Sequence, residues 1–176
     1  MDEPNNDDPM APRPASASRS NLSLIAIPAH ANPQGVLHGG VMLRLADECG
    51  GIAALRHVGR GKVLTATFDS MVFLSPVHIG ELVHALAEVS HVGRTSIEAQ
   101  IEIYAESPIS LQKRKVAAGF ALYVALDELG GKPQPVRPLL LETEADRLRD
   151  EAGKARQAIR LARRAEAKLH VPDLSP

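Results

Sequence analysis

The sequence predicts an α+β fold in which one long helix packs against an antiparallel sheet. The first observation is a helical spacing of apolar residues over 39–57. The second is a change of period after that helix, because the apolar segments that follow alternate as half-buried strands do. The third is the glycine punctuation between those segments, at Gly80, Gly93, Gly130 and Gly131.

Composition divides the chain of 176 residues into three parts. Residues 1–20 are rich in proline, acidic and small side chains, which predicts a disordered N-terminal tail. Residues 21–142 hold the helical and alternating segments and are expected to form one domain. Residues 143–170 return to a helical pattern rich in arginine and lysine, which predicts a C-terminal basic helix.

The domain is expected to begin with a short strand over 22–27, which ends at Pro28. A turn-rich loop follows at 31–35, and the long helix then spans 39–57. One stripe of this helix is apolar and built partly from small residues, namely Met42, Leu45, Cys49, Ile52 and Ala53. A helix of this kind is expected to be enclosed by the rest of the domain.

Two glycines, Gly50 and Gly51, lie inside that helix. Each costs up to about 1 kcal/mol relative to alanine in a helix interior. We therefore expect another backbone to approach the helix closely at this point.

The rest of the domain is expected to be strands. The expected strands are 62–75, 81–91, 95–106 and 116–126, of which the first three alternate around an apolar spine. The last of them is almost continuously apolar, as a strand covered on both faces is.

A final helix is expected over 144–170. Its apolar stripe is thin, and is expected to dock on the domain or on another subunit because it is too weak to stand alone; it consists of Leu148, Ala152, Ala155, Ile159 and Ala162. Its arginines gather on another face, which either helps to attract phosphates or is simply solvated.

Several classes of protein are excluded by composition. A net charge of −1 provides no general attraction for nucleic acid or for an anionic membrane, and no segment is apolar enough to span one. The N-terminus lacks the apolar stretch of a signal peptide. A single cysteine, Cys49, excludes an internal disulfide and a cysteine-based metal cluster, and suits a reducing cytoplasm.

The start of the long helix is the first candidate site. Gly39 and Gly40 open the helix, where free N–H groups and the positive end of the helix dipole can polarise a carbonyl or hold an oxyanion. Asp47 lies two turns further on among apolar neighbours, which is a costly place for a carboxylate. Taken alone, the same residues also fit an ordinary turn and a solvent-facing aspartate.

The glycine turn at Val92–Ser96 is the second candidate site. Arg94, Thr95 and Ser96 offer guanidinium, hydroxyl and N–H donors that suit a phosphate. An ordinary hairpin with an exposed arginine has the same composition.

Four blocks of the sequence, taken together and in this order, resemble the acyl-coenzyme A thioester hydrolases of the hotdog fold. The resemblance is to the cytosolic type, which includes the two-domain brain enzyme and single-domain bacterial relatives, and it covers about residues 22–165. The blocks are Asn32–Gly40 with Asp47 and Glu48, Phe73–Gly80, Val92–Ser96 and Tyr123–Asp127.

The resemblance implies a long helix wrapped by an antiparallel sheet, and a dimer that forms edge to edge with active sites at its interface. Asn32 of one chain would orient water or the thioester, and Asp47 of the other would act as general base or nucleophile. Gly40 would donate its N–H to the oxyanion, with Gly39 allowing close approach, and Arg94, Thr95 and Ser96 would bind CoA.

The resemblance also implies a trimer of dimers. The activity would be hydrolysis of acyl-CoA to a free acid and CoA in the cytoplasm, with no cofactor and no metal, and with no nucleic acid polymer or membrane as partner. One alternative is a non-catalytic hotdog module that binds acyl-CoA as a sensor or scaffold. The other is an aryl-CoA thioesterase of the same fold.

Overall fold

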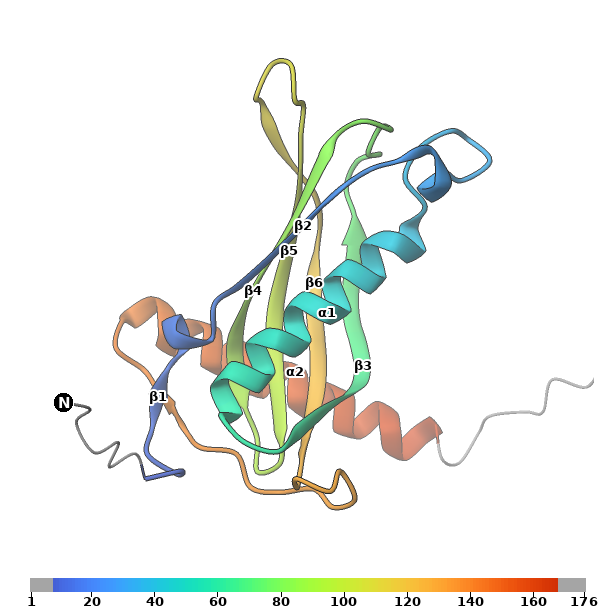
Figure 1. The fold of residues 1–176 in the computed structure, drawn as a ribbon. Coiled ribbons are helices and arrows are strands. Elements are labelled where there is room, and N and C mark those ends of the chain that lie inside the picture. Colours follow the sequence, from blue (N-terminus) through green and yellow to red (C-terminus); the bar gives the residue numbers. More distant parts are fainter. Residues whose placement is uncertain (1–7, 168–176) are drawn as a thin grey trace, which may run out of the picture.

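The computed structural model describes residues 8–167 of the chain. Its main sheet has five antiparallel strands in the order β2-β4-β5-β6-β3, with α1 on one face and α2 on the other (Figure 1). The elements in chain order are β1 (Arg13–Pro14), the 3-10 helix η1 (Ala15–Ser18), β2 (Ser20–Ile25), the 3-10 helix η2 (Pro28–His30), α1 (Gly39–Val58), β3 (Lys62–Phe73), β4 (Leu82–Val92), β5 (Ser96–Glu106), β6 (Lys113–Leu126), β7 (Leu139–Leu140) and α2 (Glu144–Ala167).

The predicted α+β architecture, with a sheet wrapped on one helix, is confirmed. The helix expected over 39–57 is α1, and each expected strand of the domain overlaps one of β2 to β6. The largest shift is in β6, which begins at Lys113 instead of residue 116 because its basic N-terminal residues pair with acidic residues of β5.

The core lies between α1 and the sheet. From Ala99 onward the side chains of β5 alternate between buried and half-buried, and those that face α1 are fully buried. Burial of an isoleucine side chain such as Ile101 contributes about 1.5–3 kcal/mol. The facing surface of α1 consists of small residues, so that the helix lies close to the strands and is enclosed as expected; it includes Ala46, Cys49, Gly50 and Ala53.

Residues 13–20 are ordered, which corrects the tail predicted for 1–20. The Ser18 hydroxyl donates to the Ala15 carbonyl at 2.6 Å and accepts from the Val89 N–H at 2.9 Å. The buried Ser20 hydroxyl donates to the carbonyl of Cys49 at 2.7 Å. These small hydroxyls bind main-chain groups of the domain, a contact that composition does not reveal. Residues 1–7 lie outside the described part of the chain.

The C-terminal helix docks on the domain through its polar side, so of the two predicted surfaces for its apolar stripe, the domain and another subunit, the domain is wrong. Leu148 and Ile159 are 59% and 52% exposed, whereas Asp150 and Gly153 are buried against the sheet. A Cβ atom at residue 153 would lie 2.3 Å from the Cβ of His91, so that glycine is required for this close approach. The expected residues 168–170 lie outside the described part of the chain.

A buried carboxylate anchors α2. The Glu98 side chain is fully buried and accepts hydrogen bonds from Arg156 at 2.7 Å, Arg160 at 2.6 Å and the Ser90 hydroxyl at 2.7 Å. Burial by itself raises the pKa of Glu98, but the three donors outweigh it and the net pKa lies below its ordinary value. The prediction of a solvated basic face is therefore wrong for Arg156 and Arg160, which bind a buried carboxylate.

Other contacts complete the docking of α2. The guanidinium of Arg156 stacks on Phe120, with 3.7 Å between its carbon and the ring centroid. Arg160 also pairs with Asp69 of β3 at 3.0 Å, and His91 Nδ1 lies 2.6 Å from an Asp150 carboxylate oxygen. The helix is thus bound by ion pairs to several strands of the outer face.

We expect replacement of Glu98 by glutamine to destabilise the protein by about 3 kcal/mol, because both buried arginines lose their shared carboxylate. This corresponds to a decrease in Tm of about 6–12 °C. Because the folded-state pKa is lowered, the stability from Glu98 is complete above its ordinary pKa near 4.5 and decreases as pH falls below it. The difference in Tm between E98Q and wild type should therefore narrow in acid.

The control is Glu48→Gln, since Glu48 pairs with Arg44 on the surface of α1 and is 48% exposed. It should change Tm by little at any pH. Equal effects of the two substitutions in thermal unfolding monitored by circular dichroism would contradict the anchoring role of Glu98.

Candidate active site

The loop before α1 is held in place by Asn32. Its side-chain oxygen accepts from the N–H groups of Gln34 at 3.0 Å and Val36 at 3.3 Å, and Gly35 adopts a φ of 75° that suits glycine. The loop is tied to the segment after β3 by a bond from the Leu37 N–H to the Val77 carbonyl at 2.9 Å. The side-chain nitrogen of Asn32 makes no hydrogen bond to any described residue, whereas its main-chain N–H donates to the Val36 carbonyl at 2.8 Å.

The start of α1 differs from the expectation in one respect. His38 is the N-cap, and its Nδ1 accepts from the Gly40 N–H at 2.9 Å. This bond requires the tautomer with the proton on Nε2. The predicted oxyanion donor is therefore occupied by the ring of His38 in the free protein. Gly39 lies against the ring of Phe73 at the end of β3.

Asp47 projects from the middle of α1 and is half-buried. Its Oδ1 accepts from the hydroxyl of Thr65, which is in β3, at 2.7 Å. Its main-chain carbonyl accepts from the Tyr123 hydroxyl, which is in β6, at 3.0 Å. Glu48, its neighbour, is exposed and pairs with Arg44, so the aspartate alone is directed toward the strands.

The close approach expected at the glycine pair is present, but it comes from a side chain instead of a backbone. A Cβ atom at residue 50 would lie 2.3 Å from the Tyr123 hydroxyl oxygen and 2.9 Å from a methyl carbon of Ile101. At residue 51 the nearest atom would be 3.7 Å away, which is ordinary contact. Gly50 is thus required sterically and Gly51 is not.

The turn between β4 and β5 holds the other predicted residues. The Gly93 N–H donates to the Ser96 carbonyl at 2.9 Å, and the carbonyls of Arg94 and Thr95 accept from main-chain N–H groups of the segments that follow β5. Arg94 is exposed and forms no ion pair with a described residue. Its guanidinium is therefore available to an anion.

The structure does not bring the two groups of predicted residues together. Ser96 pairs with Val124 in β6, and β6 pairs at that end with Lys62, which follows the end of α1. The β4–β5 turn therefore lies at the end of the sheet where α1 ends, opposite the end where α1 begins (Figure 1). Within one chain, Gly39, Gly40 and the Asn32 loop are separate from Arg94–Ser96.

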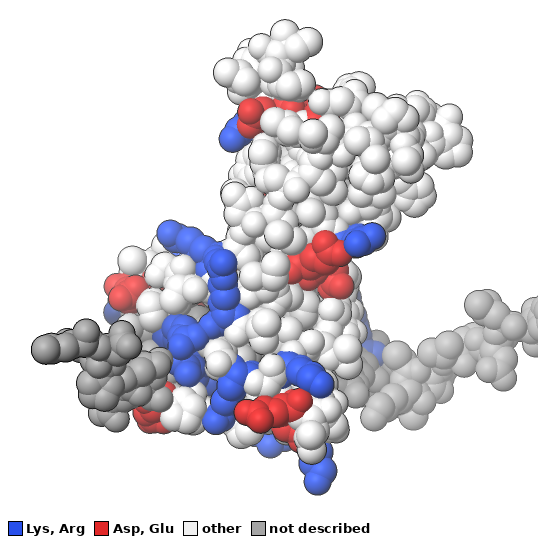
Figure 2. All heavy atoms as spheres, viewed as in Figure 1, with Lys and Arg blue, Asp and Glu red and all other residues white. Residues whose placement is uncertain are grey.

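Charge is unevenly distributed on the face that carries α1. The end where α1 begins is almost free of charged side chains in this view, whereas Lys and Arg gather near the end of α1 (Figure 2). Large apolar side chains are exposed near the charge-poor end, including Ile27 at 43%, Phe73 at 47% and Leu74 at 57%. The surface beside Gly39 and Gly40, called the apolar entrance below, is therefore apolar.

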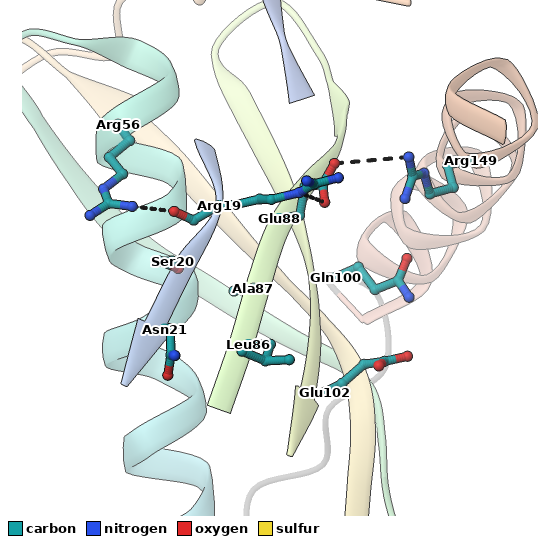
Figure 3. A pocket seen from close by; sticks show the side chains of 10 residues that line it. All are labelled: Arg19, Ser20, Asn21, Arg56, Leu86, Ala87, Glu88, Gln100, Glu102 and Arg149. Carbon is teal, nitrogen blue, oxygen red and sulfur yellow. Dashed lines mark hydrogen bonds and ion pairs between the residues drawn. The ribbon is translucent and has the colours of Figure 1, made fainter. Parts of the chain in front are cut away.

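A groove of about 580 Å³ lies at the edge of the sheet formed by β2. Arg19 crosses it to Glu88 at 2.8 Å, and Arg56 and Arg149 line its two sides (Figure 3). None of the residues predicted for the site lines this groove. Its arginines are bound internally, since Arg56 donates to the Arg19 carbonyl and Arg149 pairs with Asp146.

Among the described residues, no group of His, Cys, Asp and Glu side chains is arranged to hold a metal ion. No helix in that part of the chain is both long and apolar enough to cross a membrane. Cys49 is buried, as expected of a small core residue, and burial raises the pKa of its thiol.

Sequence reasoning missed Thr65 and Tyr123, the residues bonded to Asp47, and did not assign a role to His38. Strand alternation placed Thr65 on the same face as Val63, and hence toward α1, but did not place it opposite the aspartate. Tyr123 lay in one of the four blocks that carried the resemblance. The capping bond of His38 depends on a rotamer that a sequence does not specify.

Comparisons with known proteins identify the family of the chain. A family model described as the Thioesterase superfamily matches residues 34–111. An uncharacterised acyl-CoA thioester hydrolase of Zymomonas mobilis is 33% identical over 146 residues, which cover 81% of this chain and 94% of that protein. The chain belongs to this superfamily. The mouse cytosolic acyl coenzyme A thioester hydrolase is 34% identical over 149 residues, or 82% of this chain, but these make up only 39% of the mouse protein.

Solved structures give the fold of this thioesterase superfamily member. An acyl-CoA hydrolase of Staphylococcus aureus, determined with butyryl-CoA, CoA and CoA disulfide, has a TM-score of 0.80 at 29% identity and covers 89% of this chain and 94% of its own. An apo-hexameric acyl-CoA thioesterase has a TM-score of 0.81 at 30% identity, with 88% and 98% covered. The hotdog fold is thereby confirmed. The S. aureus enzyme was also solved with an aspartate, an asparagine or a threonine replaced by alanine.

Proposed function

We propose that the protein hydrolyses acyl-CoA thioesters to a free carboxylic acid and CoA, at sites that two chains form together. The observation that best supports this proposal is the half-buried carboxylate of Asp47, which is oriented by Thr65 in a chain of the thioesterase superfamily. The relatives named above support the class of substrate. The asparagine and aspartate replaced in the S. aureus variants are as far apart in sequence as Asn32 and Asp47.

Asp47 is proposed to act either as general base or as nucleophile. As a base it takes a proton from water, whose oxygen adds to the thioester carbon, and the C–S bond then breaks to release CoA as the thiolate. As a nucleophile it forms an anhydride with loss of the same thiolate, and water then hydrolyses the anhydride. A thiolate leaves with little protonation, so this site requires no cofactor and no metal in either route.

The Gly40 N–H is proposed to stabilise the oxyanion, a contribution of about 3–4 kcal/mol. Since His38 accepts this N–H in the free protein, the imidazole has to turn away before the thioester carbonyl can bind. Breaking the capping bond costs about 0.5–1.5 kcal/mol. The substrate therefore competes with a residue of the protein for the same donor.

Pairing of two chains is proposed to complete the site. Within the described residues β3 pairs only with β6, and its free edge carries Leu64 and Val72, which are 61% and 52% exposed. Two β3 edges joined antiparallel across a two-fold axis place the β4–β5 turn of one chain near the start of α1 of the other. Arg94, Thr95 and Ser96 would then bind the CoA phosphates, and the apolar entrance would receive the acyl chain.

The dimers are further proposed to assemble into a hexamer, and the protein to be cytoplasmic. A hexameric thioesterase of Yersinia pestis, like the apo-hexameric enzyme, supports a trimer of dimers. The mammalian relatives named as cytosolic and the lone, buried cysteine support a cytoplasmic location. The partners proposed are acyl-CoA and further copies of the chain, with neither nucleic acid nor membrane involved.

We expect the wild-type protein to release free thiol from a panel of acyl-CoAs of different chain length that includes benzoyl- and phenylacetyl-CoA. Asp47→Asn keeps the shape of the side chain but removes its charge, and should reduce kcat by about 10²–10⁴-fold. Glu48→Gln, one residue away on the exposed side, should retain full activity. Binding of CoA esters without turnover by the wild type would instead indicate a sensor or scaffold, and preference for the aryl substrates would indicate an aryl-CoA thioesterase.

Mixed dimers test whether two chains share one site. Asn32→Ala and Asp47→Ala should each abolish activity as homodimers. Coexpression of the two variants yields heterodimers in which one site has both native residues, so that about a quarter of wild-type activity should return. No recovery, with heterodimers demonstrated by mass spectrometry, would place Asn32 and Asp47 in the same site of one chain.

Two substitutions of His38 should separate activity from stability. His38→Ala frees the Gly40 N–H, and should raise kcat/KM by about 2–10-fold while lowering Tm because the cap is lost. His38→Asn is a stronger N-cap and should raise Tm while lowering kcat/KM. If activity instead follows Tm in both variants, His38 does not compete with the substrate.

A further inference from the structure

A cross-strand pair of the sheet holds Asp47 at two points. Thr65 of β3 and Tyr123 of β6 are direct register partners. The Thr65 hydroxyl donates to the carboxylate of Asp47 at 2.7 Å, and the Tyr123 hydroxyl donates to its main-chain carbonyl at 3.0 Å. The side chain and the backbone of Asp47 are therefore both hydrogen-bonded to the same cross-strand pair of the sheet.

The Tyr123 hydroxyl reaches the helix because residue 50 has no side chain. A Cβ atom there would lie 2.3 Å from the hydroxyl oxygen, which is too close for any side chain, and 3.1 Å from the ring carbon that bears it, which is tighter than ordinary contact. The glycine destabilises the interior of α1 relative to alanine, but this contact is sterically possible only with glycine at residue 50. No comparable contact exists at Gly51.

The Tyr123 hydroxyl keeps its proton and can therefore always donate this hydrogen bond. Tyr123 is 1% exposed, and burial raises its pKa, with the charge of Asp47 as a smaller cause. It therefore stays protonated throughout the range in which a thioesterase is assayed. The carbonyl of Asp47 lies within a regular helix, so this bond uses its second lone pair and is not needed to complete the helix.

We propose that Tyr123 is a positioning residue for catalysis, which sets the rotation and the height of α1 over the sheet so that the Asp47 carboxylate stays bonded to Thr65. This rests on the proposed function, in which Asp47 carries the reaction. Tyr123 does not touch the substrate. Its loss therefore misplaces the carboxylate without altering the surfaces that bind CoA.

The test compares Tyr123→Phe with Ile101→Val. Tyr123→Phe removes the hydroxyl alone, and should lower kcat by about 5–50-fold with KM changed less than about twofold, since small displacements of a catalytic group are costly. Ile101→Val is the matched control, because it removes a methyl group from the same spot beside Gly50 without touching a hydrogen bond. Both should lower Tm by a few degrees, but Ile101→Val should leave kcat within about twofold.

A double-mutant cycle tests the pairing of Tyr123 with Gly50. Gly50→Ala should lower kcat as Tyr123→Phe does, because the new methyl group displaces the hydroxyl. In the Tyr123→Phe background the same substitution loses its shortest contact, that with the hydroxyl, and keeps those with the ring carbon and Ile101, so its effect on kcat should be smaller but not abolished. Independent effects, or equal losses of kcat in Tyr123→Phe and Ile101→Val, would overturn the proposal.

Crystal structures separate failure of this proposal from failure of the proposed function. In Tyr123→Phe the Thr65–Asp47 hydrogen bond should be lost or lengthened beyond 3.5 Å, and in Ile101→Val it should be kept. If the wild type hydrolyses no CoA ester, the proposed function is wrong and Tyr123 has no catalytic part. If the wild type is active but Tyr123→Phe keeps both the bond and kcat, only the positioning role is wrong.

Discussion

The closest packing of α1 on the sheet, at Gly50, determines much of the architecture of this protein. Small residues on one stripe let the helix lie close to one face of the sheet. At Gly50 the Tyr123 hydroxyl contacts the helix backbone. The interior is close-packed, so that a shift of the helix at this place moves the residues one turn away. Asp47 is one of these residues, and a packing constraint thereby becomes a constraint on the site.

The two faces of the sheet are covered by different physical means. The inner face buries aliphatic side chains of β5 against α1, and requires only shape and apolarity. The outer face binds α2 through the ion pairs of Glu98 with Arg156 and Arg160. The apolar stripe of α2 is left exposed. A buried ion pair stabilises only while each member keeps its partners, so α2 responds to pH and to single charge changes in a way that α1 does not.

The groups of the candidate site lie at two ends of a single chain. The N–H of Gly40 and the apolar entrance lie at one end of the sheet, and Arg94 lies at the other. A thioester and the phosphates of CoA are also at opposite ends of one long molecule. The free β3 edge offers a geometrical solution, since a two-fold axis exchanges the two ends of the sheet.

Periodicity and turn residues determined the order and the type of the elements, because those signals are local: α1 and the strands β2 to β6 follow directly from them. Gly40, Asp47 and Arg94 were likewise visible as unusual polar or glycine positions, and Asn32 was singled out by the resemblance to a known family. Only the tertiary structure decided which groups meet. The bonds of Asp47 to Thr65 and Tyr123, the capping of Gly40 by His38, the ordered segment 13–20 and the polar docking of α2 all join residues through rotamers or across distant strands. Spacing along a chain carries no record of such contacts, because they depend on the register of the sheet and on the side chains that fill the space between its layers.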